Sequence, residues 1–71
     1  MEITLVEYTQ QEQQQRSDEI KSTTGYKPTE VQLYQDLKDS TELLFPGLQV
    51  KDIARAKITH TLIFVLEPIE H

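Results

Sequence analysis

The sequence contains one sustained apolar run, from Ile58 to Leu66. Residues 62–66 are apolar at every position and lack the polar alternation of a strand that faces water on one side. A short continuous run of this kind, ending at Glu67 and Pro68, predicts a strand buried on both faces. The rest of the chain, or a second copy of it, must therefore cover this strand.

The chain has 71 residues and no cysteine, which limits how it can be stabilised. One domain over residues 1–71 is expected at this length, and a chain this small buries only about 60% of its unfolded surface. Disulfides and thiolate metal sites are excluded, and neither His60 nor His71 has the neighbour spacing of a metal site. We therefore expect no metal or cofactor, and self-association as the additional stabiliser.

The N-terminal half predicts a strand followed by a helix. Residues 2–8 are β-formers that place Ile3, Leu5 and Glu7 on one face. Thr9 and Glu12 have the spacing of a capping box, so we expect a helix over residues 10–23. This helix has almost no apolar stripe, which is typical of an exposed or partner-bound helix. The glycine at position 25 suits its C-cap.

Residues 28–44 predict a second, amphipathic helix, with Pro28 in its first turn. Apolar or small side chains recur on one face at the three–four spacing of a helix: Val31, Leu33, Tyr34, Leu37, Thr41 and Leu44. The breakers Pro46 and Gly47 follow. We expect this helix to pack on the sheet.

From Leu48 the apolar period changes to two. We expect a hairpin with one strand near residues 48–54, a turn near 54–57 and the buried strand over 58–66. Even positions, including His60, are expected to face the helix, and Ile63 and Val65 the opposite side. The fold class is therefore α+β: a small β-α-α-β-β domain with an antiparallel C-terminal hairpin and a helix packed on one sheet face.

The predicted face at Ile63 and Val65 has no obvious cover within the chain. The helix over residues 10–23 lacks the apolar stripe that would bury it. We expect a homodimer or a protein partner to close this face, and we take Ile63 and Val65 as candidate protein-binding residues.

The net charge is −5, and the acidic excess lies in residues 1–46. An acidic surface repels phosphate backbones, so nucleic acid is not the expected partner of the whole molecule. Asp36, Asp39 and Glu42 are the candidate acidic contacts on the second helix. They suit an inhibitor that mimics nucleic acid, of the type that phages and mobile elements encode.

Lys51, Arg55 and Lys57 form the one basic cluster and share a face if the hairpin is extended. The segment from Val50 to Arg55, read VKDIAR, resembles the first-helix motif of LacI-type helix-turn-helix headpieces, which implies a short helix over 50–57 and DNA binding. A strand followed by two helices also resembles ribbon-helix-helix repressors, which dimerise through their N-terminal strands. The alternative function is therefore a nucleic-acid-associated transcriptional regulator that uses the basic hairpin face.

Catalysis is not expected, because the carboxylate pairs lie on exposed helix faces and the two glycines form no phosphate loop. The apolar run is shorter than the roughly 20 residues of a membrane span. The N-terminus lacks a signal-peptide pattern, so we expect a cytoplasmic protein without membrane contact. The leading function is a small, acidic, non-enzymatic protein-binding module: a regulator, inhibitor or accessory subunit.

Overall fold

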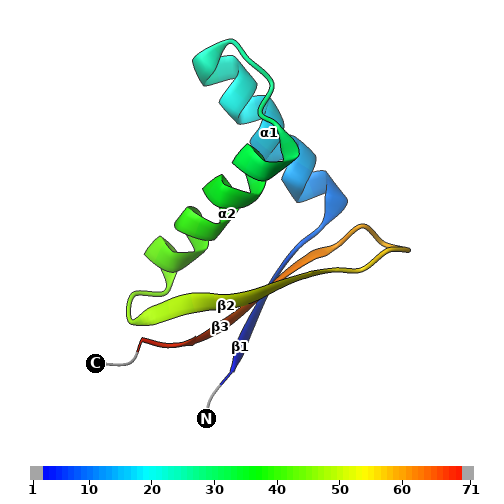
Figure 1. Cartoon of the computed structure of the whole chain (residues 1–71). Helices are drawn as coiled ribbons and strands as arrows, with labels where there is room; N and C mark the ends of the chain where they lie inside the picture. Colours follow the sequence, from blue (N-terminus) through cyan, green and yellow to red (C-terminus); the bar gives the residue numbers. More distant parts are fainter. Residues whose placement is uncertain (1–2, 70–71) are drawn as a thin grey trace.

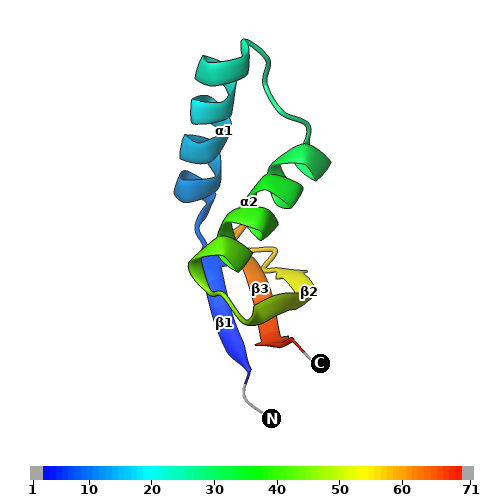
Figure 2. The same cartoon turned by 90° about the vertical axis from the view of Figure 1, so that its left-hand side faces the viewer.

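The computed structural model describes residues 3–69, so the predicted strand start at Glu2 and the position of His71 lie outside it. The elements are β1 (Thr4–Tyr8), α1 (Gln10–Thr24), α2 (Glu30–Leu44), β2 (Leu48–Arg55) and β3 (Leu62–Pro68). The sheet is antiparallel in the order β1-β3-β2, and both helices lie on one side of it (Figures 1 and 2). The predicted α+β class, element order and C-terminal hairpin are confirmed.

The core lies between β3 and α2. Leu62, Phe64 and Leu66 alternate along β3 and are buried, and Leu37 of α2 packs against them. Ile63 and Val65 are only half-buried, so β3 is buried on one face, not on both as its continuous apolar run predicted. Central position in the sheet, flanked by β1 and β2, accounts for the partial burial of the other face.

The third strand begins at Leu62 rather than at residue 58, which corrects the predicted hairpin. Ile58 is 95% exposed in the connecting loop, and His60 lies there with a φ of 57°. A hydrogen bond from the Ala56 N–H to the Thr61 carbonyl closes the loop at 2.9 Å. His60 is therefore an exposed loop residue and not an inward-facing strand residue.

Helix α1 is tied down by polar contacts. Its predicted capping box is present, since Thr9 and Glu12 exchange two side chain–backbone hydrogen bonds of 3.1 Å, and Gly25 ends the helix in the left-handed region. The buried Gln13 donates from Nε2 to the carbonyls of Tyr8 and His60, at 2.9 Å each. The Gln13 side-chain amide thus anchors α1, a helix with almost no apolar stripe, to the end of the sheet.

Helix α2 covers the sheet with the middle of its predicted stripe. It begins at Glu30 after a Thr29 N-cap, so Pro28 precedes the helix instead of occupying its first turn. Leu37 and Thr41 are buried, whereas Val31 and Leu44, at the helix ends, are 77% and 71% exposed. The apolar spacing continues beyond the part of the helix that contacts β2 and β3.

A β-bulge between Val50 and Asp52 shifts the alternation of β2 by one residue. Before it, Val50 pairs with Leu66 on the helix side; after it, Ile53 pairs with Phe64 on that side. Ala54 pairs with Ile63 and faces the open side, contrary to the prediction of a single parity along residues 48–58. A bulge opposes two residues to one, which reverses the facing of every later side chain.

The structure bears on both resemblances to DNA-binding folds. Residues 50–55 lie in β2, so the short helix implied by the headpiece motif is absent there. Strand β1 pairs with β3 of its own chain. Within residues 3–69, no helix is long and apolar enough to cross a membrane.

Candidate functional site

The sheet face opposite the helices contains Ile63 and Val65. Strand register places Glu7, Ile63 and Ala54 side by side in one row across the sheet. In the next row, Leu5 and Asp52 flank Val65. In Figures 1 and 2 no described element covers this face.

The apolar residues of this face form an oblique band, here called the open-face stripe. It runs from one edge strand to the other through Ala54, Ile63, Val65 and Leu5. Ile3 directly precedes β1, and the alternation of the strand places it next to Leu5 on the same face. Leu5 is 60% exposed and Ile3 is 55% exposed. Of the residues in this stripe, the sequence analysis assigned Ile63 and Val65 to partner contact. The β1 alternation already placed Ile3 and Leu5 on one face, but the strand order was needed to join the two sets.

Carboxylates flank the stripe on both sides. Glu7 lies beside Ile63 on the β1 edge, and Asp52 lies beside Val65 on the β2 edge. Among residues 3–69 neither Glu7 nor Asp52 has an ion-pair partner, although Asp52 accepts a 2.8 Å hydrogen bond from the Ile53 N–H. Glu67, further along β3, forms an ion pair with Lys51, with 3.8 Å between Glu67 Oε2 and Lys51 Nζ. The uncompensated charge of this face is therefore negative.

The acidic candidates on α2 are all engaged within the chain. Arg16 donates to Asp36 from Nε at 2.6 Å and from Nη2 at 2.9 Å, and these bonds hold the pKa of the Asp36 carboxyl below its usual value. Asp39 accepts from Gln35 Nε2 at 2.9 Å, and Glu42 accepts from the Val50 N–H at 3.0 Å. Of these three acids, only Asp39 is exposed.

The basic candidates are separated by the bulge. Lys51 reaches Glu67 on the open side, whereas Arg55 pairs with Leu62 of β3 on the helix side and donates to Glu30 Oε1 at 2.7 Å. The prediction that these two cations share a face is therefore wrong. Lys57 is exposed in the β2–β3 loop.

Glu30 connects the basic edge to α2. Its Oε1 accepts from the Tyr34 hydroxyl at 2.6 Å as well as from Arg55. The Tyr34 hydrogen bond, with the Arg55 charge next, lowers the pKa of Glu30. Burial, followed by the same hydrogen bond, raises the pKa of Tyr34. Arg55 is thus already committed to an intramolecular contact.

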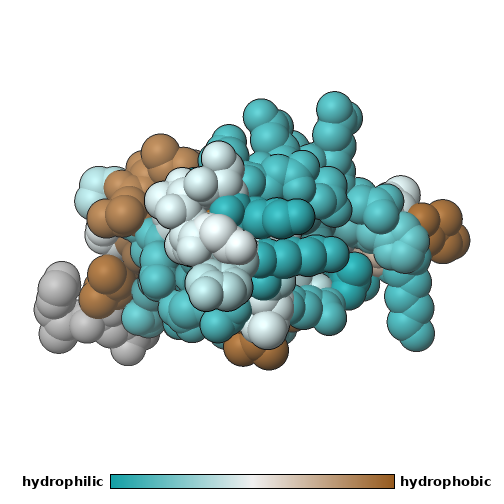
Figure 3. Space-filling model, turned by 90° about the horizontal axis from the view of Figure 1, so that it is seen from above, coloured by the Kyte–Doolittle hydropathy of each residue, from teal (hydrophilic) through white to brown (hydrophobic). Residues whose placement is uncertain are grey.

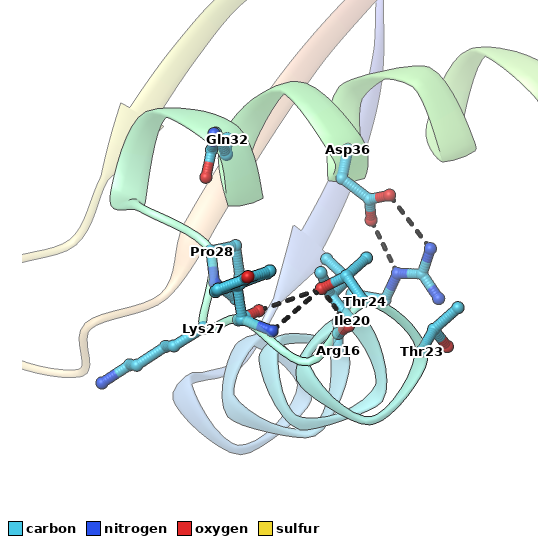
Figure 4. A pocket seen from close by; sticks show the side chains of 9 residues that line it. Arg16, Ile20, Thr23, Thr24, Lys27, Pro28, Gln32 and Asp36 are labelled. Atoms are coloured by element: carbon cyan, nitrogen blue, oxygen red, sulfur yellow. Dashed lines mark hydrogen bonds and ion pairs between the residues drawn. The ribbon is translucent and has the colours of Figure 1, made fainter.

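A concave region of about 510 Å³ lies between the end of α1 and the start of α2. Figure 4 shows the Arg16–Asp36 ion pair at one end, while Lys27 points away from the other residues. Ile20 and Pro28 supply apolar lining. The two charged groups of the pair satisfy each other and hold the helices together, and the rest of the lining is a mixture of apolar and polar side chains, including Thr23 and Gln32.

A third exposed apolar group lies where α2 ends. Leu43, Leu44 and Phe45 are exposed there, and Ile69 is held nearby by a 3.0 Å hydrogen bond to the Gly47 carbonyl. In Figure 3 hydrophobic atoms gather at this end of the molecule, while the helical surface is largely hydrophilic. This group lies around the turn between α2 and β2 and not on a face of the sheet.

Residues 3–69 contain no group of three His, Asp or Glu side chains placed to hold a metal ion. Comparisons with protein families, curated proteins and solved structures give no match. Among the described residues, the open-face stripe with its flanking carboxylates is the best-defined candidate for a functional surface.

Proposed function

We propose that this chain is a small, acidic, non-enzymatic protein-binding module that acts as a regulator, inhibitor or accessory subunit. The open-face stripe is its contact surface. The observation that carries the proposal is the exposure of Leu5 and Ile3 beside the half-buried Ile63 and Val65 on a face without helices. Contiguous exposed apolar side chains rimmed by polar residues are typical of protein interaction sites.

The surface area of the chain is larger than that of a compact monomer of the same mass. A compact monomer of 8.3 kDa is expected to expose about 4600 Å². This chain exposes 5386 Å². The molecule is elongated, with principal extents of 40 × 28 × 16 Å, and this shape raises its area. A partner on the open face would give the sheet the second apolar layer that layered domains have.

Affinity capture from cells that express the chain tests this proposal, with and without nuclease. We expect a protein that is retained after nuclease treatment by the wild type and by Ile58→Glu, and lost by Leu5→Glu. Both substitutions replace an exposed aliphatic residue with a glutamate, and only Leu5 lies on the stripe. Equal capture by all three forms would contradict the proposed surface.

The same experiment separates the alternatives. A partner lost on nuclease treatment would favour the nucleic-acid-associated regulator, with Lys51, Arg55 and Lys57 as its contacts. A partner lost only on neutralisation of Asp36, Asp39 and Glu42 would favour an inhibitor that mimics nucleic acid.

A further inference from the structure

We propose that the open-face stripe binds an amphipathic helix of a partner protein, whose apolar side is flanked on both edges by lysine or arginine. This inference rests on the proposed protein-binding function and specifies the chemistry of the partner. It follows from the shape of the stripe and from the charges beside it.

The shape of the stripe fits a rod rather than a broad layer. Each row across the sheet contains a polar residue at a different strand: Glu7 on β1 in one row and Asp52 on β2 in the next. The apolar side chains are therefore confined to an oblique band that crosses all three strands. Strand spacing and rise per residue give this band a length of about 16 Å. A helix of about 11 residues, or three turns, spans that distance.

The layer arrangement also favours a helix. The other face of the sheet is covered by α2, and a helix on the open face would complete a helix–sheet–helix arrangement. The stripe side chains are short or branched: Ala54, Val65, Ile63, Leu5 and Ile3. They leave a shallow surface on which the apolar side of an amphipathic helix can lie, as in other helix-recognition modes.

The charges select a cationic partner. Glu7 and Asp52 lie on opposite sides of the stripe, and neither has an ion-pair partner within the described part of the chain. A helix lying along the stripe would place its two polar edges beside these carboxylates. Cationic side chains there gain attraction, whereas acidic ones are repelled, because complementary charge at the rim sets partner choice.

A second copy of this chain is a poorer occupant for the same reason. Face-to-face packing of two identical sheets would bring another Glu7 and another Asp52 to the interface. Among residues 3–69, Lys51 is the one cation of this face, and it is already paired with Glu67. Like-charge juxtaposition of this kind disfavours a partner.

Fluorescence anisotropy with three labelled peptides of about 14 residues tests the inference, since that length forms three to four turns. One peptide has a leucine stripe flanked by lysines, the second has the same stripe flanked by glutamates, and the third is a scramble of the first. The chain is used whole, and its self-association is measured by sedimentation equilibrium in the same buffer.

We expect the lysine-flanked helix to bind and the other two peptides to show no binding. Leu5→Glu should abolish binding, and Ile58→Glu should leave it unchanged. The pair Glu7→Gln and Asp52→Asn should weaken binding about tenfold, which corresponds to two rim charges. The matched pair Asp18→Asn and Asp39→Asn, on the helices, should change it by less than about threefold.

Three results would overturn the inference. Equal binding of the lysine- and glutamate-flanked helices would remove the charge selection and leave the open face as a protein-binding surface. A dimer that Leu5→Glu dissociates would make a second copy the occupant. If the chain is monomeric and binds none of the peptides, a helical occupant is rejected. The affinity-capture experiment with Leu5→Glu would then still test the proposed function by itself.

Discussion

The Tyr8 hydroxyl lies 2.6 Å from Thr41 Oγ1 and joins β1 to α2 across 33 positions of the chain. Thr41 donates its single hydroxyl proton to the Leu37 carbonyl at 2.7 Å, so Tyr8 is the donor to Thr41. The Tyr8 ring also meets Phe64 edge to face, with centroids 5.6 Å apart. This one side chain therefore connects an edge strand, the covering helix and the central strand.

Replacing Thr41 with valine removes the only acceptor of the Tyr8 hydroxyl within residues 3–69. We expect a loss of about 1–3 kcal/mol of unfolding free energy, because a half-buried donor is left unpaired. Tyr8→Phe should cost less, about 0.5–1.5 kcal/mol. Urea denaturation of both single variants and the double variant measures this. The double variant should lose less than the sum of the two, and strict additivity would contradict the hydrogen bond.

Gln13→Glu should destabilise the chain more than Gln13→Ala. The Gln13 amide donates to two carbonyl oxygens, at Tyr8 and at His60. A carboxylate in its place would face both oxygens as an acceptor and would be buried. We expect a cost of about 1–3 kcal/mol for the alanine and more for the glutamate at neutral pH. Thermal unfolding followed by circular dichroism ranks the stabilities of the two variants. A Gln13→Glu chain more stable than the Gln13→Ala chain would contradict the anchoring of α1.

The Arg16–Asp36 pair should make stability depend on pH in the acid range. The folded-state pKa of the Asp36 carboxyl lies below the unfolded value of about 3.9. The contribution of the ion pair to the free energy of unfolding is therefore present above that value and is lost as pH falls through the folded-state pKa. Both side chains are partly exposed, so we expect Asp36→Asn to cost about 0.5–1 kcal/mol at pH 7. The difference in unfolding free energy between Asp36→Asn and the wild type should become smaller below about pH 4. Asp39→Asn is the matched control, and a gap that persists at about pH 2 would contradict the ion pair.

Phe64→Ala should cost about 3–5 kcal/mol, because the ring is fully buried beneath α2. That loss is comparable to the whole stability of a small domain, so we expect an unfolded chain at room temperature. Ile58→Ala, in the exposed loop, should change stability by less than about 0.5 kcal/mol. Circular dichroism of the two variants makes this comparison, and a folded Phe64→Ala chain would contradict the assigned core.

Local chemistry made much of the fold predictable. The Thr9–Glu12 capping box and Gly25 fixed the ends of α1, and the two-residue period identified the hairpin. The start of β3 was misplaced, because Ile58 extends the apolar run while His60, two residues later, adopts a left-handed turn. The ends of α2 were overestimated as core, since helical spacing says nothing of where the sheet beneath it ends.

The candidate site was only partly predictable for a different reason. The bulge between Val50 and Asp52 contains no glycine, so the local sequence does not predict it. It sends Arg55 and Lys51 to opposite sides and brings Ala54 onto the open face. Membership of the open-face stripe also depends on β1 pairing with β3, which is a long-range choice that local patterns do not encode.

The most direct measurement of the central claim is the change in amide and methyl chemical shifts of the isotope-labelled chain when its captured partner is added. We expect the largest changes at Leu5, Ile63 and Val65, with little change at Val31 and Ile58. Changes confined to Lys51, Arg55 and Lys57, or to Asp36, Asp39 and Glu42, would contradict the open face as the contact surface.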